Sequence, residues 1–248
     1  MPSAARLLVL LLGLMLLALP ATASAKSKRG IDVSRFQGVI GWKLVGETKL
    51  KFAYAQASRG SGNDCLVVPE ECGGDQTYDR NYRSAKDVGM RVGAYHRAFA
   101  SGATPLAAKA DAREEANLFI DVVGKVRSSD LRPALDVETP FDDMTPISLR
   151  AWIKAWLARV EAKLGQTPLI YTNASSWSAT GDTTSFADSG HPLWVANFDV
   201  KRPIVPAANW GGKGWAIWQF TSSGRVRGIE GNVDKNRLSG GLGKISAR

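Results

Sequence analysis

The chain has 248 residues, with 32 Lys and Arg against 23 Asp and Glu, which gives a formal net charge of +9 at pH 7. Its 44% hydrophobic and 22% charged residues are typical of a folded globular protein and exclude a disordered, collagen-like or disulfide-dense chain. The basic residues are scattered apart from the short cluster Lys26–Arg29, which argues against a nucleic-acid partner. The positive charge then indicates either a solvated surface or attraction to an extracellular polyanion.

The first 25 residues have the order of a secretory signal peptide. Arg6 precedes an unbroken apolar run over Leu7–Leu19, which is too short to span a bilayer, and the small residues Ala23–Ala25 supply a cleavage site. Cleavage before Lys26 would leave 223 residues with a net charge of +8. We therefore expect a secreted or periplasmic monomer without stable membrane association; the alternative is an uncleaved apolar anchor.

Two cysteines, Cys65 and Cys72, stand close together in the exported part. Oxidising compartments favour a disulfide between such a pair, which would stabilise the fold by about 2–3 kcal/mol. The alternative is a zinc site with His96 and His191 as the third and fourth ligands, but the spacing of these cysteines and histidines resembles no known zinc pattern. The sequence therefore predicts a disulfide and neither a metal nor another cofactor.

Eight short β-rich segments alternate with helical patterns along the mature chain. Several of these segments are apolar on both faces, as the strands of a buried parallel sheet are. They are 30–34, 52–57, 91–95, 132–138, 168–172, 193–197, 216–220 and 232–234. The sequence predicts an α/β fold, a TIM-like barrel in one domain over residues 26–248, with its core at about 30–240.

Apolar residues at three- and four-residue spacing predict long helices at about 145–164 and 105–123. Each begins with Thr-Pro and ends before a glycine, which are helix start and stop signals. Shorter helices are predicted at 79–88 and just after Trp42. The helical signal fades after Asn173, so the last strands are expected to be joined mostly by loops.

Acidic residues follow several of these apolar strands. Asp136 and Glu138 flank Val137 on one strand, so their side chains point to the same side with Cα atoms roughly 6.6 Å apart. Parallel barrels carry their chemistry at the carboxyl ends of the strands. Asp32 and Asp234 end the first and last predicted strands, which are neighbours in a closed barrel. Four carboxyls at one mouth of the barrel fit a glycosidase cleft. The alternative for Asp136 and Glu138 taken alone is an ion-paired or metal-binding site.

Aromatic side chains lie in or beside other strands. Tyr95, Tyr171, Trp194, Trp215 and Trp218 could stack against sugar rings, or could simply pack in the core. Tyr171 is the member of this set that most favours a position at the mouth, because Thr172-Asn173 follows it.

These motifs, taken in chain order, resemble those of glycoside hydrolase family 25, the Chalaropsis-type lysozymes or N-acetylmuramidases. The resemblance covers about residues 30–240 and rests on the segments Gly30-Ile-Asp-Val-Ser-Arg-Phe-Gln-Gly38 with Trp42, Asp75-x-x-Tyr78-x-x-Asn81, Gly93-Ala-Tyr-His96, Leu135-Asp-Val-Glu138, Pro168-Leu-Ile-Tyr171-Thr172, Leu193-Trp194, Trp218-Gln219 and Gly228-Ile-x-Gly231-x-Val-Asp234-x-Asn236. It implies a (β/α)5(β)3 barrel that hydrolyses, with retention, the β-1,4 bond between N-acetylmuramic acid and N-acetylglucosamine in peptidoglycan. The rival hypothesis is a barrel that binds peptidoglycan without cleaving it.

The resemblance also implies roles for the acids. Glu138 corresponds to the general acid and base, and Asp136 to the group that orients the 2-acetamido substituent or, alternatively, to a direct nucleophile. Asp32 and Asp234 would line the site and help to keep Glu138 protonated. Two carboxyls on one strand lie on the same side of the sugar, which favours acetamido participation over direct attack.

We assign substrate contacts to six further residues: Tyr171, Tyr95, Trp194, Trp218, Arg97 and Asn236. Tyr171 would hydrogen-bond the acetamido group. Arg97 and Phe198 stand where the family more often has other residues, and Arg97 adds a charge that could contact the glycan or a stem peptide. These departures leave the acids untouched and affect only the expected preference for substrate.

Overall fold

The computed structural model describes residues 28–61, 73–141 and 143–248 of the 248-residue chain. The predicted signal peptide and the cysteines Cys65 and Cys72 lie outside the described residues. In the part that is described, no helix is both long enough and apolar enough to cross a membrane.

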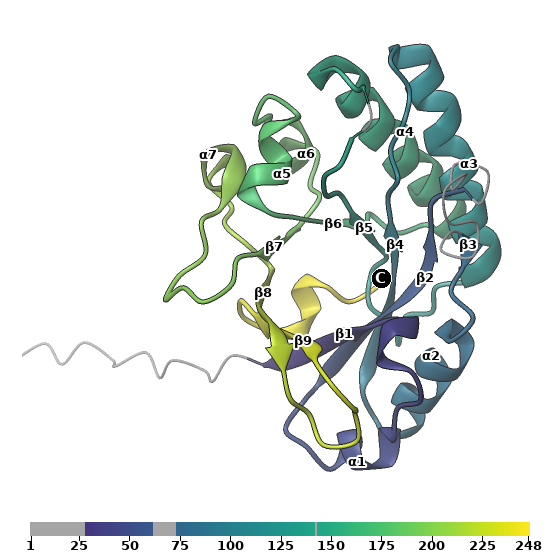
Figure 1. The fold of residues 1–248 in the computed structure, drawn as a ribbon, viewed down its shortest axis with the longest axis vertical. Helices are drawn as coiled ribbons and strands as arrows, with labels where there is room; N and C mark the ends of the chain where they lie inside the picture. The colour runs from purple at the N-terminus through teal and green to yellow at the C-terminus, as the bar shows by residue number, and fades with distance from the viewer. Residues whose placement is uncertain (1–27, 62–72, 142) are drawn as a thin grey trace, which may run out of the picture.

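Eight strands form a closed barrel, as predicted (Figure 1). Neighbouring barrel strands from β1 through β8 are parallel, while β9 is antiparallel to both of its neighbours and β1 pairs with β2 to close the ring. The barrel strands are β1 (Arg29–Val33), β2 (Phe52–Arg59), β4 (Arg91–Arg97), β5 (Ala134–Asp136), β6 (Leu169–Thr172), β7 (Leu193–Ala196), β8 (Ile217–Gly224) and β9 (Val233–Leu238). The two-residue strand β3 (Gly73–Gly74) extends the sheet beside β2.

The last strand is longer than predicted and runs antiparallel to both of its neighbours. The sequence indicated an apolar strand over 232–234 that ends in Asp234, whereas β9 begins at Val233 and continues to Leu238. An antiparallel strand starts at the barrel end where its parallel neighbours finish. Asp234 therefore still reaches the mouth, and it lies directly opposite Asp32 in the β1–β9 register.

Helices cover the first half of the barrel and thin out in the second, which confirms the predicted (β/α)5(β)3 arrangement (Figure 1). In the described residues, the α-helices are α1 (Trp42–Gly46), α2 (Tyr78–Asp87), α3 (Pro105–Val123), α4 (Pro146–Leu164), α5 (Ala174–Ser178), α6 (Ser185–Asp188) and α7 (Pro206–Gly211), and the 3-10 helices are η1 (Arg35–Gln37) and η3 (Leu242–Lys244). Both long helices have the expected caps. The side chains of Thr104 and Thr145 accept hydrogen bonds from the first turn, and Gly124 and Gly165 end the helices with positive φ.

Two apolar layers hold the barrel together. One lies between the strands and the surrounding helices, and the other fills the barrel below its mouth with side chains such as Phe52, Tyr54 and Trp194. The C-terminal segment contributes to the second layer through Ile245, whose carbonyl accepts a hydrogen bond from the backbone of Arg132. The barrel interior is therefore packed with side chains below its mouth.

A buried polar chain ties β2, β4 and α3 together beside the mouth. His96 on β4 meets the Ser58 hydroxyl at 2.8 Å and the Glu115 carboxylate at 2.5 Å, and all three side chains are buried. Burial lowers the pKa of His96 to about 3, so the imidazole is neutral. His191, the other histidine of the zinc alternative, instead meets the carbonyl of Pro168.

Gly93 on β4 leaves room for the ring of Tyr54. A Cβ at position 93 would lie 2.4 Å from Tyr54 Cε1, closer than real Cβ contacts come. We expect Gly93→Ala to lower the free energy of unfolding by about 1–3 kcal/mol, since the ring has no space to move in a packed interior. Gly243→Ala is the matched control because a Cβ there meets nothing within 4 Å. Equal denaturation midpoints for the two variants would contradict this packing argument.

Candidate active site

All four predicted acids meet at one pocket of about 280 Å³ in the mouth of the barrel. The strands bring them together from distant parts of the chain, as the sequence predicted. The pocket is lined by Asp32, Tyr95, Asp136, Glu138, Tyr171, Trp194, Phe198, Gln219, Ser222 and Asp234. We call this the acid pocket.

A network of amides holds Asp32 on one side of the acid pocket. Gln219 Nε2 donates to both carboxylate oxygens at 3.1 Å, and Asn236 Nδ2 donates to Oδ2 at 2.6 Å. Each amide is fixed in turn: Tyr171 donates its hydroxyl to Gln219 Oε1 at 2.9 Å, and Trp194 donates its indole N–H to Asn236 Oδ1 at 2.8 Å. Asp32 is therefore rigidly placed and has donors suited to a carboxylate.

Asp136 and Glu138 form the other side of the acid pocket, and Arg97 lies against both. Arg97 Nε lies 3.7 Å from Asp136 Oδ2, and its Nη2 lies 3.7 Å from Glu138 Oε2. The same guanidinium donates to the backbone carbonyls of Glu138 and Thr139, at 3.2 and 3.3 Å. Arg97 thus holds both the backbone and the carboxyls at the end of β5.

Burial and crowding raise the pKa of three of the four acids. Desolvation raises the pKa of Asp32 to about 6 even though Asn236 and Gln219 oppose it by hydrogen bonding. Desolvation, followed by the charges of Asp32 and Glu138, raises the pKa of Asp234 to about 8. The pKa of Asp136 is also raised well above its usual value, chiefly by burial and then by Glu138, while Arg97 acts in the opposite direction. Near neutral pH, Asp234 is the protonated partner of the Asp32–Asp234 pair.

Three of the six predicted substrate contacts line the acid pocket: Tyr95, Tyr171 and Trp194. Their rings pack on one another, with Trp194 edge-on to Tyr171 at a centroid distance of 5.1 Å and to Tyr95 at 6.4 Å. Burial raises the pKa of both tyrosines well above 10, so both are neutral hydroxyls. The pocket therefore combines an aromatic wall with acidic groups.

The other three predicted substrate contacts, Asn236, Arg97 and Trp218, do not line the acid pocket. Asn236 is fully buried beneath Asp32, and Arg97 lies behind the β5 carboxyls rather than in the lining. Trp218 points to the outside of the barrel, where its indole N–H donates to the carbonyl of Asn197 at 2.8 Å. These positions favour support of the acids for Asn236 and Arg97, and a separate surface for Trp218.

Sequence reasoning did not select Gln219, although it links Tyr171 to Asp32. Strand alternation places Gln219 on the same side of β8 as Ile217, but both Ile217 and Trp218 are apolar and buried, so alternation alone does not show which side faces the barrel interior. Phe198 was noted only as a departure from the family, and Ser222 was not noted at all; both line the acid pocket.

Comparisons with known proteins agree with this geometry. The family model described as "Glycosyl hydrolases family 25" matches residues 31–229. Lysozyme M1 of Streptomyces globisporus is 31% identical over 233 residues, covering 91% of this chain and 72% of that protein. An N,O-diacetylmuramidase of Chalaropsis sp is 27% identical over 219 residues, covering 83% of this chain and 95% of that protein.

A solved structure is similar over nearly its whole length. The bacterial lysozyme from Streptomyces coelicolor superposes with a TM-score of 0.74 at 31% identity, covering 90% of this chain and 96% of that one. The barrel and its acid pocket define a glycoside hydrolase. The chain belongs to glycoside hydrolase family 25 and is an enzyme of the lysozyme, or muramidase, type.

Proposed function

We propose that this protein is exported and hydrolyses the β-1,4 bond between N-acetylmuramic acid and N-acetylglucosamine in peptidoglycan, with retention at the anomeric carbon. The observation that carries the proposal is the meeting of Asp32, Asp136, Glu138 and Asp234 at one aromatic-walled pocket. A core would not accumulate four carboxyls, whereas a glycosidase needs at least two beside the scissile bond. Cleavage would take place with peptidoglycan strands as the partner and without a metal or other cofactor.

Glu138 is the proposed general acid and base. Its side chain is 28% exposed while that of Asp136 is 11% exposed, so Glu138 stands nearer to where a leaving oxygen and a water would be. It would protonate the glycosidic oxygen in the first step and deprotonate the attacking water in the second.

Asp136 is proposed to orient and stabilise the 2-acetamido group of the muramic acid. Among the described residues, no donor meets its buried oxygen Oδ1. That acceptor is suited to an N–H group of the substrate, since a buried oxygen without a donor is costly. Because Asp136 and Glu138 project from the same side of one strand end, they are poorly arranged for attack from opposite faces of the sugar. Acetamido participation is therefore the proposed route, with the Tyr171 hydroxyl beside the same group.

Digestion of purified peptidoglycan tests the proposal. New reducing ends, reduced with borohydride and identified by mass spectrometry, should be muramic acid ends; N-acetylglucosamine ends would show the other bond to be cut. Proton NMR of the first product should show the β-anomer, as retention requires. A protein that sediments with peptidoglycan and releases no ends would instead be the binding barrel, and the enzymatic proposal would fail.

Residues 1–25 are proposed to act as a signal peptide that directs export, and residues 26–248 to form the mature barrel domain. In the oxidising compartment outside the cytoplasm, Cys65 and Cys72 are proposed to form a disulfide. N-terminal sequencing of the secreted protein should begin at Lys26. Intact-mass measurement before and after reduction should differ by two hydrogens.

Arg97 should set the acidic limb of the pH–activity profile. The charge of Arg97 counteracts the raised pKa of Asp136, so Arg97→Leu should raise that pKa further and move the acidic limb to higher pH. Activity should therefore fall most at low pH, where Asp136 loses its charge, and least at high pH. Arg97→Lys keeps the charge and should shift the limb less. An unchanged pH profile in Arg97→Leu, with activity reduced equally at every pH, would contradict this role.

A further inference from the structure

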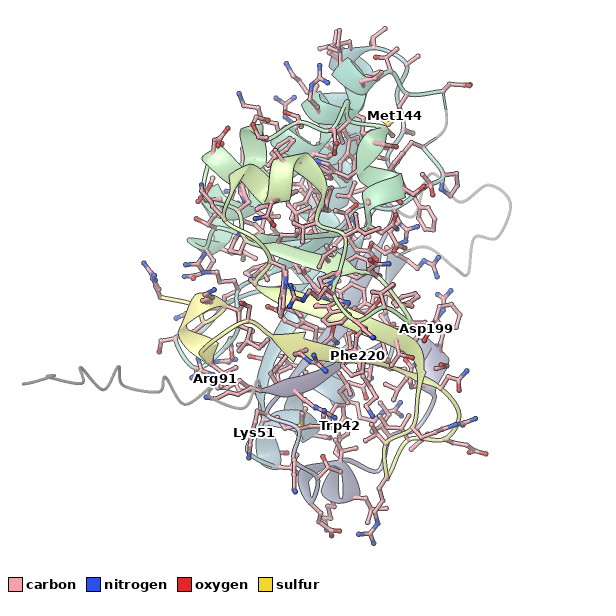
Figure 2. The ribbon with its side chains drawn as sticks, turned by 90° about the vertical axis from the view of Figure 1, so that its left-hand side faces the viewer. Trp42, Lys51, Arg91, Met144, Asp199 and Phe220 are labelled. Carbon is pink, nitrogen blue, oxygen red and sulfur yellow. The ribbon has the colours of Figure 1, made fainter. Side chains whose placement is uncertain are left out.

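A second concavity, of about 530 Å³, lies on the outside of the barrel across the β7–β8 loop from the acid pocket. We call it the basic groove and define it by Lys201, Arg202, Lys213, Trp215, Trp218 and Arg237. The same loop serves both sites: Phe198 lines the acid pocket, and Lys201, three residues later, lines the basic groove. Figure 2 faces this side of the molecule and labels Asp199 in the loop and Phe220 on β8.

The groove exists because no long helix covers this part of the barrel. Only the short α7 lies between β7 and β8, so the outer face of β8 borders this concavity rather than a long helix. Strand alternation turns Trp218 outward, and its indole N–H holds the loop through the carbonyl of Asn197. Trp215 stands edge-on to Trp218 at a centroid distance of 6.1 Å. The two indoles form an aromatic floor.

Four cations line this floor, and none of the described residues that line it is acidic. Lys201 and Arg202 are exposed on the loop. Arg237 lies deeper, with its guanidinium over the rings of Trp218 at 5.2 Å and Phe220 at 5.4 Å. Its Nε is buried, and no described residue accepts a hydrogen bond from it. The groove therefore combines uncompensated positive charge with an unused buried donor.

The cations and indoles of the basic groove suit a ligand that has both carboxylates and apolar groups. Guanidinium and ammonium groups bind carboxylates by charge-assisted hydrogen bonds, and indoles pack against apolar faces. Peptidoglycan supplies this chemistry, because each muramic acid carries a lactyl group that bears a peptide with carboxylates. A strand seated in the acid pocket would also bring its neighbouring peptides close to the β7–β8 loop.

We propose that the basic groove binds stem-peptide carboxylates of peptidoglycan outside the acid pocket and so raises the affinity for peptide-bearing strands. This inference rests on the proposed function, since it places part of the same substrate on a second surface. It makes the groove a specificity site: strands that retain their peptides are bound more tightly than bare glycan.

The test compares two substrates, intact peptidoglycan and the same material stripped of its peptides by an amidase. Lys201→Glu/Arg202→Glu should raise KM on intact peptidoglycan by about threefold to tenfold and leave kcat unchanged, because these exposed charges act on binding at a distance from the cleaved bond. Values of kcat/KM on the stripped glycan should stay the same. Added salt should shrink the difference between wild type and variant.

The matched control is Lys109→Glu/Arg113→Glu. It makes the same charge change at two exposed residues of α3, which packs against β2 on the opposite side of the ring from β8. If the charge-reversal variant Lys201→Glu/Arg202→Glu folds poorly, the neutral variant Lys201→Gln/Arg202→Gln is used in its place, and its Tm is measured to confirm that it is folded. An equal loss on both substrates, or an equal loss in the control, would overturn the proposal.

Two further outcomes separate binding of the peptide from binding of a wall polymer and from failure of catalysis. If the loss occurs only with walls that retain phosphodiester polymers, and vanishes after acid extraction of those polymers, the ligand is the phosphodiester and the peptide assignment is wrong. If wild type cleaves neither substrate, the proposed function fails on its own. The groove is then judged by co-sedimentation, where a double variant that binds intact peptidoglycan less than wild type does, but stripped glycan equally well, would still support it.

Discussion

Glu138→Gln is expected to lower kcat on peptidoglycan by about 10³-fold. Glutamine keeps the shape of the side chain but neither donates a proton to the leaving oxygen nor accepts one from water, and general acid–base catalysis is typically worth 10²–10⁴-fold. A factor of 10³ corresponds to about 4 kcal/mol of lost transition-state stabilisation. The rate of release of reducing ends from purified peptidoglycan measures the effect.

Binding should survive this substitution. The aromatic wall, Asp32 and Asp136 all remain, so the variant should still sediment with peptidoglycan and should melt close to wild type. Glu114→Gln on α3 is the matched control, because Glu114 is exposed and stands outside the acid pocket. If Glu138→Gln kept more than a tenth of the wild-type rate, the catalytic assignment would have to pass to another of the four acids.

The acids could be predicted from the sequence because simple periodicity locates them. Alternation along one strand places Asp136 and Glu138 on a shared face with Val137 pointing away, and the structure has Val137 buried in the outer apolar layer. Closure of a barrel brings its first and last strands together, which was enough to pair Asp32 with Asp234. These inferences needed only the positions of the strands.

The direction of β9 could not be predicted in the same way. Apolar residues on both faces indicate that strands are buried in a mostly parallel sheet, but they do not fix the direction of one particular strand, which depends on its connection. Here a loop without a crossover helix joins the end of β8 to the start of β9, which permits an antiparallel pair. Asp234 lies at its predicted place opposite Asp32, although β9 is antiparallel to both of its neighbours.

Side-chain placement on β8 was also beyond the sequence. Ile217 and Trp218 are both apolar and both buried, so alternation of polarity does not tell which one faces inward. The wrong choice would exchange the roles of Trp218 and Gln219. Arg97 presented a related difficulty, because a long flexible side chain at a strand end takes its direction from charged partners that only the assembled barrel supplies.

Asp136→Asn is expected to lower kcat by about 10²–10³-fold, and a second measurement should show why. If the acetamido group is the nucleophile, Asp136 acts by holding that group and by balancing its developing positive charge, so a neutral amide loses the charge but keeps the shape. A muramic acid thiazoline, which mimics the cyclic intermediate, should then inhibit wild type strongly and the Asp136→Asn variant weakly. Raising the pH should not restore the variant, because asparagine does not titrate.

A direct nucleophile predicts the opposite chemistry. A disaccharide fluoride with fluorine in place of the 2-acetamido group cannot assist its own cleavage, yet it would still trap a carboxylate as a stable glycosyl ester. Intact-mass analysis of wild type after incubation with this reagent should show no adduct. An added sugar mass that peptide mapping places on Asp136 would establish direct attack, and Asp136 would then be the nucleophile rather than the partner of the acetamido group. Asp136 ends β5 and Glu138 follows two residues later into the same pocket, which favours the first outcome because both carboxyls approach the sugar from the same side.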